Sequence, residues 1–126
     1  MSTDNDTAKM DLVRVCHSAD LDSGDARGYT LALDRGELEV VVAMRGEFRY
    51  AYVNSCPHTG PPLNWLPDRF LDNTGQFLQC STHFALFEVD TGLCVQGPCH
   101  GQSLRKLELC ERDGWLYVDL GPKRGN

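Results

Sequence analysis

The sequence predicts an all-β domain, on three observations. Short runs rich in β-branched and aromatic residues recur along the chain, and most are separated by turns that contain glycine. No window shows the 3.6-residue apolar stripe of an amphipathic helix. The chain has the length of one domain, 126 residues, and contains no internal repeat. We therefore expect small antiparallel sheets within a single domain.

The run at residues 38–44 is the most apolar, and its β-branched residues are typical of a central strand covered on both faces. The next run places Phe48, Tyr50 and Tyr52 on one face and leads the chain toward Cys56. Turn residues bound the others. The expected strands cover residues 12–16, 28–33, 38–44, 48–53, 76–79, 84–89, 104–110 and 115–120.

The two ends of the chain lack apolar periodicity. Residues 1–10 are expected to form a flexible N-terminal tail and residues 122–126 a C-terminal tail, which leaves residues 11–121 as the domain. No window approaches the roughly 18 apolar residues of a membrane helix, so no membrane partner is expected. The polar, acidic N-terminus carries no secretory signal, and a cytoplasmic location is expected.

Charge and cysteine content narrow the function classes. The net charge of −6 and the pI near 5.0 argue against a nucleic-acid partner, which would require a basic stripe. The acidic surface either serves solubility or steers the protein toward a basic face of a redox partner. Six cysteines would suggest a disulfide framework in a secreted protein, but without a secretory signal metal ligation is favoured.

Two matched Cys/His pairs stand out, Cys56-Pro57-His58 and Cys80-Ser81-Thr82-His83. A lone cysteine or histidine is more often a packing residue, but two such pairs, each following a predicted strand, indicate a metal site. A structural zinc site with two cysteines and two histidines is one alternative. Zinc fingers usually pair cysteine with cysteine and histidine with histidine, whereas a [2Fe–2S] core takes two thiolates on one iron and two imidazoles on the other.

The pattern Cys-x-His followed by Cys-x-x-His resembles the Rieske iron–sulfur family. The resemblance covers nearly the whole chain, including Leu21-Asp22-Ser23-Gly24, the valine-rich strand, Thr91-Gly92, and Gly97-Pro98 with Leu104 beyond it. It implies the Rieske iron–sulfur fold, with one [2Fe–2S] cluster per chain. The cluster-binding part, at about residues 54–100, would be formed by two ligand loops.

The same resemblance implies the roles of the four ligands. Cys56 and Cys80 would bind one iron, and His58 and His83 the outer iron. The Gly97-Pro98 turn resembles the family's third loop, which covers the cluster. His58 and Cys80 are separated by 21 residues, more than in the shortest members, and the excess falls at residues 64–70.

By resemblance, the protein would be a single-electron carrier rather than an enzyme. It would pass electrons from a flavin-dependent reductase to a terminal ring-hydroxylating oxygenase or another redox enzyme. No nucleophile or acid–base pair stands out, and the chain is too short to add the mononuclear iron domain of Rieske oxygenases. Two alternatives stay open: a Rieske-like small subunit of an assimilatory nitrite reductase or other oxidoreductase complex, and a redox or iron sensor module.

The remaining cysteines have no predicted place in the metal site. Cys16 and Cys110 lie in predicted strands and are expected to be buried as small apolar groups. Cys94 and Cys99 flank the Gly-Pro turn, where a disulfide and two free thiols are both open. The absence of any sign of an oxidising compartment favours the free thiols.

His17 and His100 lack matched partners and are expected at the surface rather than as ligands. The longer connection between the ligand loops contains Trp65, Leu66 and Phe70. These three apolar residues either pack against the domain or form a docking surface beside the histidine ligands.

The residues around the site predict a low reduction potential. Two thiolates and two neutral imidazoles leave the oxidised site uncharged, so it accepts an electron more readily than a four-thiolate site. Respiratory Rieske proteins add a disulfide between the ligand loops and two hydroxyl donors near the cluster. The corresponding disulfide positions here are Pro61 and Ser81, and the hydroxyl positions are Ala85 and Phe87.

We therefore expect a redox titration to give a midpoint near the lower end of the Rieske range, about −150 mV. The physical reason is that neither Ala85 nor Phe87 has a side-chain donor to stabilise the added negative charge. A midpoint well above zero would contradict this expectation.

Overall fold

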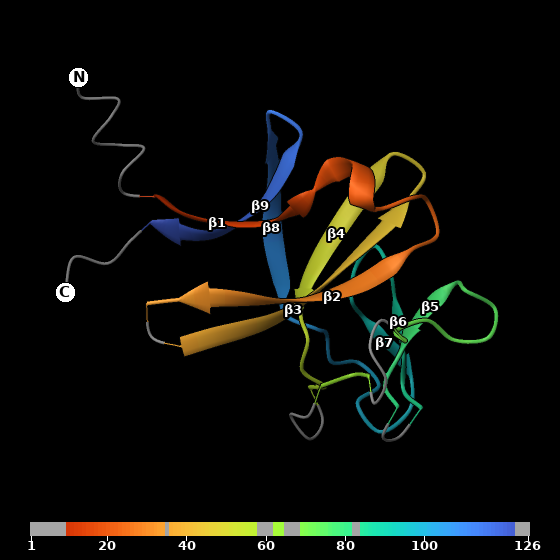
Figure 1. The fold of residues 1–126 in the computed structure, drawn as a ribbon. Coiled ribbons are helices and arrows are strands. Elements are labelled where there is room, and N and C mark those ends of the chain that lie inside the picture. The colour runs from red at the N-terminus through yellow and green to blue at the C-terminus, as the bar shows by residue number, and fades with distance from the viewer. Residues whose placement is uncertain (1–9, 35, 58–61, 65–68, 82–83, 123–126) are drawn as a thin grey trace.

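The computed structural model describes residues 10–34, 36–57, 62–64, 69–81 and 84–122. These residues form an all-β fold, as predicted, with nine strands and one short 3-10 helix (Figure 1). None of their helices is long and apolar enough to cross a membrane. The elements are β1 Met10–His17, η1 Ser18–Asp20, β2 Ala26–Leu33, β3 Gly36–Arg45, β4 Phe48–Val53, β5 Phe77–Gln79, β6 Leu86–Glu88, β7 Cys94–Gln96, β8 Lys106–Arg112 and β9 Trp115–Pro122.

The strands form two antiparallel sheets. The larger has six strands in the order β1-β9-β8-β4-β3-β2, and the smaller has three in the order β5-β6-β7. In Figure 1 the small sheet lies to the right of the large one. The β3–β4 hairpin pairs Val40 with Val53 and Arg45 with Phe48, so β4 runs back and delivers the chain to Cys56, as predicted.

Strand β3 contributes to two hydrophobic cores, one on each face of the large sheet. Its residues 40–42 have no exposed surface, and Ala43 is 1% exposed. Alternation sends Val41 and Ala43 into the first core, which also contains residues of the small sheet. Val40 and Val42 enter the second core, with residues of β1 and β9. The prediction of a central strand covered on both faces is confirmed.

Several expected boundaries shift. The run at 84–89 shortens to β6, because Phe84 adopts a left-handed backbone with φ 57°. Strand β7 was not predicted, because three residues between glycine-containing turns give no readable alternation. Residues 1–9 and 123–126 of the expected tails lie outside the described residues, while Met10 and Pro122 belong to paired strands. Full burial of Cys110 was a wrong prediction, because it is only partly buried.

A buried hydrogen bond connects the two sheets. The hydroxyl of Tyr52, on β4, donates to the carbonyl oxygen of Val89, just after β6, at 2.7 Å. The Tyr52 side chain has no exposed surface. Gly92 allows the approach, because a Cβ added there would lie 2.7 Å from Cε1 of the tyrosine ring. The strand that leads to Cys56 is therefore fixed to the sheet that leads away from Cys80.

Replacing Tyr52 with Phe should lower the free energy of unfolding by about 1–3 kcal/mol, because the Val89 carbonyl would be left buried without its donor. Chemical denaturation measures this change. Tyr117→Phe is the matched control, since the contact that the Tyr117 hydroxyl makes with Arg14 is exposed and 3.5 Å long. Equal losses in the two variants would contradict the connecting role of Tyr52.

The same substitution should alter the pH dependence of stability. Burial raises the pKa of Tyr52 above its ordinary value of 10.0. Because the folded phenol holds its proton more tightly, its contribution to stability is full below pH 10.0 and is lost as the pH rises further. Tyr52→Phe should therefore reduce the loss of stability in alkaline solution.

Candidate metal centre

The first ligand loop begins where β4 ends, and Asn54 holds its two ends together. Asn54 is 7% exposed. Its Oδ1 accepts a hydrogen bond from the Leu63 amide at 2.7 Å, and its Nδ2 donates to Oδ1 of Asn64 at 2.9 Å. Cys56 follows two residues later with a side chain that is 1% exposed. One buried amide side chain therefore sets the span of the loop that carries Cys56.

Leu63 also connects the first ligand loop to the second. Its carbonyl oxygen accepts a hydrogen bond from the amide of Ser81 at 2.7 Å. Ser81 directly follows Cys80. The Leu63 side chain has no exposed surface, so the connection is made inside the first core. The backbone of one residue thus contacts both loops.

The second ligand loop follows β5 and is closed by its own backbone. The amide of Cys80 donates to the carbonyl oxygen of Ala85 at 2.9 Å, and the amide of Phe84 donates to that of Cys80 at 2.7 Å. The left-handed backbone of Phe84 makes this tight closure without a glycine and leaves its side chain 63% exposed. Cys80 itself is fully buried.

The structure brings the two predicted cysteine ligands into one environment. Cys56 and Cys80 are both buried in the first core, and neither forms a disulfide. His58 and His83 lie outside the described residues, so their assignment stays a prediction. Within the described part of the chain, the two buried sulfurs of Cys56 and Cys80 fit a metal site that has two thiolate ligands facing the first core.

A third loop, after β7, packs against the second ligand loop. Gly97 has φ +113°, and a Cβ added to it would lie 2.8 Å from the Cα of Ala85. Only glycine permits that approach. Burial, together with the neighbouring sulfurs of Cys94 and Cys56, raises the pKa of Cys99 to about 12. The third loop therefore packs against the second ligand loop, while its role in covering the cluster, which the resemblance implies, stays a prediction.

Comparison with known proteins agrees with this geometry. A family model for the Rieske [2Fe-2S] domain matches residues 11–111. The chain belongs to this family. It is 31% identical over 111 residues to the ferredoxin component of the p-cumate 2,3-dioxygenase system of Pseudomonas putida, covering 88% of this chain and 87% of that protein. Family membership assigns one [2Fe–2S] cluster to each chain, and the zinc alternative is rejected.

Solved structures show the same fold. A chain in the complex of reduced oxygenase and oxidized ferredoxin in carbazole 1,9a-dioxygenase is 26% identical, with a TM-score of 0.67, covering 90% of this chain and 96% of that chain. The ferredoxin of carbazole 1,9a-dioxygenase from Nocardioides aromaticivorans IC177 is 24% identical, with a TM-score of 0.65, covering 85% and 95%. These matches confirm the Rieske fold.

The two positions that correspond to the hydroxyl donors of respiratory Rieske proteins are apolar in this chain. Ala85 is 1% exposed and Phe87 has no exposed surface. Both face the first core. Their burial, just before and within β6, means that water cannot replace the missing side-chain donors there.

Of the apolar residues between the ligand loops, Phe70 packs against the domain. It is 1% exposed, and a Cβ on Gly28 would lie 2.7 Å from its Cζ. Its carbonyl oxygen accepts from the amide of Gln79 at 2.7 Å, next to Cys80. Trp65 and Leu66 lie outside the described residues. Phe70 thus supports the Rieske site from inside, which excludes it from a docking surface.

The other predicted residues are placed as follows. His17 and His100 are exposed, as expected, and Cys16 is buried. Sequence reasoning missed Asn54, although a polar residue between an apolar strand and Cys56 was a signal that could have identified it.

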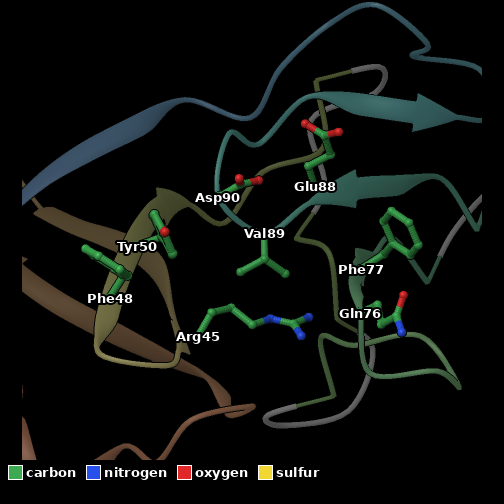
Figure 2. Close-up of a pocket in the computed structure, with 8 residues that line it drawn as sticks. All are labelled: Arg45, Phe48, Tyr50, Gln76, Phe77, Glu88, Val89 and Asp90. Atoms are coloured by element: carbon green, nitrogen blue, oxygen red, sulfur yellow. The ribbon is translucent and has the colours of Figure 1, made fainter.

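A cleft lies between the turn of the β3–β4 hairpin and the small sheet (Figure 2). Arg45 extends across it and donates from Nη2 to the carbonyl oxygen of Gly75 at 2.5 Å. Among the described residues, no cysteine or histidine lines the cleft. Its lining residues are Arg45, Phe48, Tyr50, Gln76, Phe77, Glu88, Val89 and Asp90.

Replacing Asn54 with Ala should accelerate loss of the cluster and lower the free energy of unfolding by about 1–3 kcal/mol, because the Leu63 amide would be left buried without an acceptor. Visible absorbance during incubation with an iron chelator measures cluster loss. Asn73→Ala, at an exposed turn position, is the matched control. Equal rates of cluster loss in both variants would show that Asn54 does not hold the loop.

Proposed function

We propose that this protein is a Rieske-type ferredoxin that carries single electrons to a terminal ring-hydroxylating oxygenase, with a flavin-dependent reductase as their source. One observation supports this above the others. The match to the ferredoxin component of the p-cumate system covers most of both proteins, 88% of this chain and 87% of that one. By contrast, a chain of a carbazole dioxygenase oxygenase–ferredoxin complex is matched over only 29% of its length.

We infer that Cys56 and Cys80 bind one iron, and that His58 and His83 bind the other. The burial of both thiols in the first core supports the first half of this assignment. The spacing of the histidines from those thiols supports the second half. When bound, the cluster supplies one-electron redox chemistry. The cluster-binding part is then about residues 54–100 of a domain that spans residues 11–121.

The burial of the two sulfur ligands supports electron transfer through the opposite side of the site, where the imidazoles would lie. Cys56 and Cys80 are 1% and 0% exposed, so the thiolate side of the site faces the protein interior. The imidazole side then offers the shorter route to a partner. The exposed side chain of Phe84, directly after His83, supports contact with a partner on that side.

The charge of the protein and its expected location suit this role. The net charge of −6 supports steering toward a basic face of the oxygenase or the reductase. Transfer rates that fall with increasing ionic strength would be the sign of that steering. A cytoplasmic location belongs to the same proposal, because the reductase and oxygenase of such a system must meet the carrier in one compartment.

Electron transfer can be tested with Cys80→Ser and its matched control Cys110→Ser. Cys110 is a partly buried cysteine on β8, outside both hydrophobic cores. Wild type and Cys110→Ser should be red-brown, give the rhombic reduced spectrum of a histidine-ligated cluster, and support oxygenase turnover only when the reductase is also present. Cys80→Ser should lose the spectrum and the turnover together, because one iron loses a thiolate.

The two parts of the proposal can fail separately. A wild-type cluster that is never reduced by the reductase or reoxidised by the oxygenase would contradict the carrier role. A Cys80→Ser variant that retains the wild-type spectrum would contradict the ligand assignment.

A further inference from the structure

Two cysteines outside the predicted ligand set lie in unusually close contact. Cys94 begins β7, and Cys99 follows the Gly-Pro turn five residues later. Their Sγ atoms are 2.8 Å apart. The Cys94 Sγ lies 3.3 Å from the carbonyl oxygen of Gln96. The two sulfurs are therefore closer to each other than sulfur is to oxygen in the same turn, although sulfur is the larger atom.

This separation suits a covalent bond better than a shared metal ion. Two thiolates bound to one tetrahedral zinc ion at about 2.3 Å would have their sulfurs about 3.8 Å apart. A disulfide bond is about 2.05 Å long. At 2.8 Å, Cys94 and Cys99 are too close to bind one metal ion between them and need only a small side-chain movement to bond.

The backbone holds the pair in this position. The amide of Cys94 donates to the carbonyl oxygen of Gln102 at 2.8 Å, and the carbonyl of Cys94 accepts from the amide of Gly101 at 3.1 Å. The carbonyl of Cys99 accepts from the amide of Gln102 at 2.8 Å. Both side chains are buried, at 1% and 0% exposure. The pair is therefore fixed before any bond forms.

We propose that Cys94 and Cys99 form a reversible disulfide that closes a ring around the third loop. The oxidant is a low-molecular-weight disulfide such as oxidised glutathione, which reaches the buried sulfurs when the exposed turn at residues 96–98 opens locally. Each cysteine gives up its thiol hydrogen, and one Sγ–Sγ bond forms. The two electrons and two protons pass to the oxidant, whose own sulfur–sulfur bond breaks to give two thiols.

The bond would act on the loop that packs beside the Rieske site. The ring includes Gly97, whose close contact with Ala85 fixes the third loop against the second ligand loop. Oxidation removes the hydrogen that Cys94 directs to the Gln96 carbonyl, and water can replace it because Gln96 is exposed. The effect on the cluster rests on the proposed function, whereas formation of the bond does not.

The experiment uses the intact holoprotein, reduced first and then incubated without oxygen in oxidised glutathione. Cysteines are alkylated in denaturant and counted by mass spectrometry, with peptide mapping to locate any bond. Cluster absorbance is recorded throughout. The number of alkylated cysteines in the wild type should fall from six to four, with the bond between Cys94 and Cys99. Oxidation should also slow the loss of the cluster to a chelator by about twofold or more, because a closed ring restrains the loop.

Two variants separate this bond from other thiol chemistry. Each contains five cysteines, one fewer than the six of the wild type. Cys110→Ser should fall from five alkylated cysteines to three, whereas Cys99→Ser should keep all five and gain no resistance to the chelator. If Cys99→Ser does not fold, the number of alkylated cysteines in the wild type and the peptide map of its disulfide test the proposal on their own.

Three outcomes would overturn the proposal. Six alkylated cysteines after incubation, a stable mixed disulfide with glutathione, or a bond that joins other cysteines would each show that the pair does not close. None of these readouts depends on electron transfer to a partner. Failure of the disulfide and failure of the carrier role are therefore distinguishable.

Discussion

The two hydrogen bonds of the Leu63 backbone join the two predicted ligand loops of this protein. The Leu63 amide donates to the side chain of Asn54, and its carbonyl oxygen accepts from the amide of Ser81. One contact belongs to the first ligand loop and the other to the second. Both are made in a buried environment, where water cannot replace a lost partner and an unpaired group is costly. The relative position of Cys56 and Cys80 therefore depends on Leu63, which is not itself a predicted metal ligand.

The rest of the fold supports this pair of bonds from two directions. Strand β3 fills both cores with alternate residues, so the large sheet cannot shift without disturbing the first core. The hydroxyl of Tyr52 then fixes that sheet to the small one at Val89. Each predicted cysteine ligand follows a strand, Cys56 after β4 of the large sheet and Cys80 after β5 of the small sheet. Rigid strands, rather than the loops alone, thus set where the thiols lie.

The strands and the ligand pattern could be predicted from the sequence, whereas most of the contacts around them could not. Alternation and the valine-rich run identified β3, and the spacing of the Cys/His pairs identified the family. Strand β7 escaped because three residues are too few to show a period. Cys110 was expected to be buried, yet it pairs with Tyr117 on a partly exposed part of the sheet. Asn54 was missed because its role depends on Leu63, nine residues away.

The contact between Gly97 and Ala85 connects the packing of the site to its redox properties. Respiratory Rieske proteins place a hydroxyl donor at the position of Ala85, and here that position is 1% exposed and covered by Gly97. A Cβ added on Gly97 would fall 2.9 Å from the Cβ of Ala85, so the third loop approaches residue 85 this closely because residue 97 is glycine. Glycine at residue 97 therefore permits the close approach of the third loop, and alanine at residue 85 leaves that contact without a side-chain donor. A chain packed in this way gains a tightly held third loop and gives up a group that would stabilise the reduced cluster.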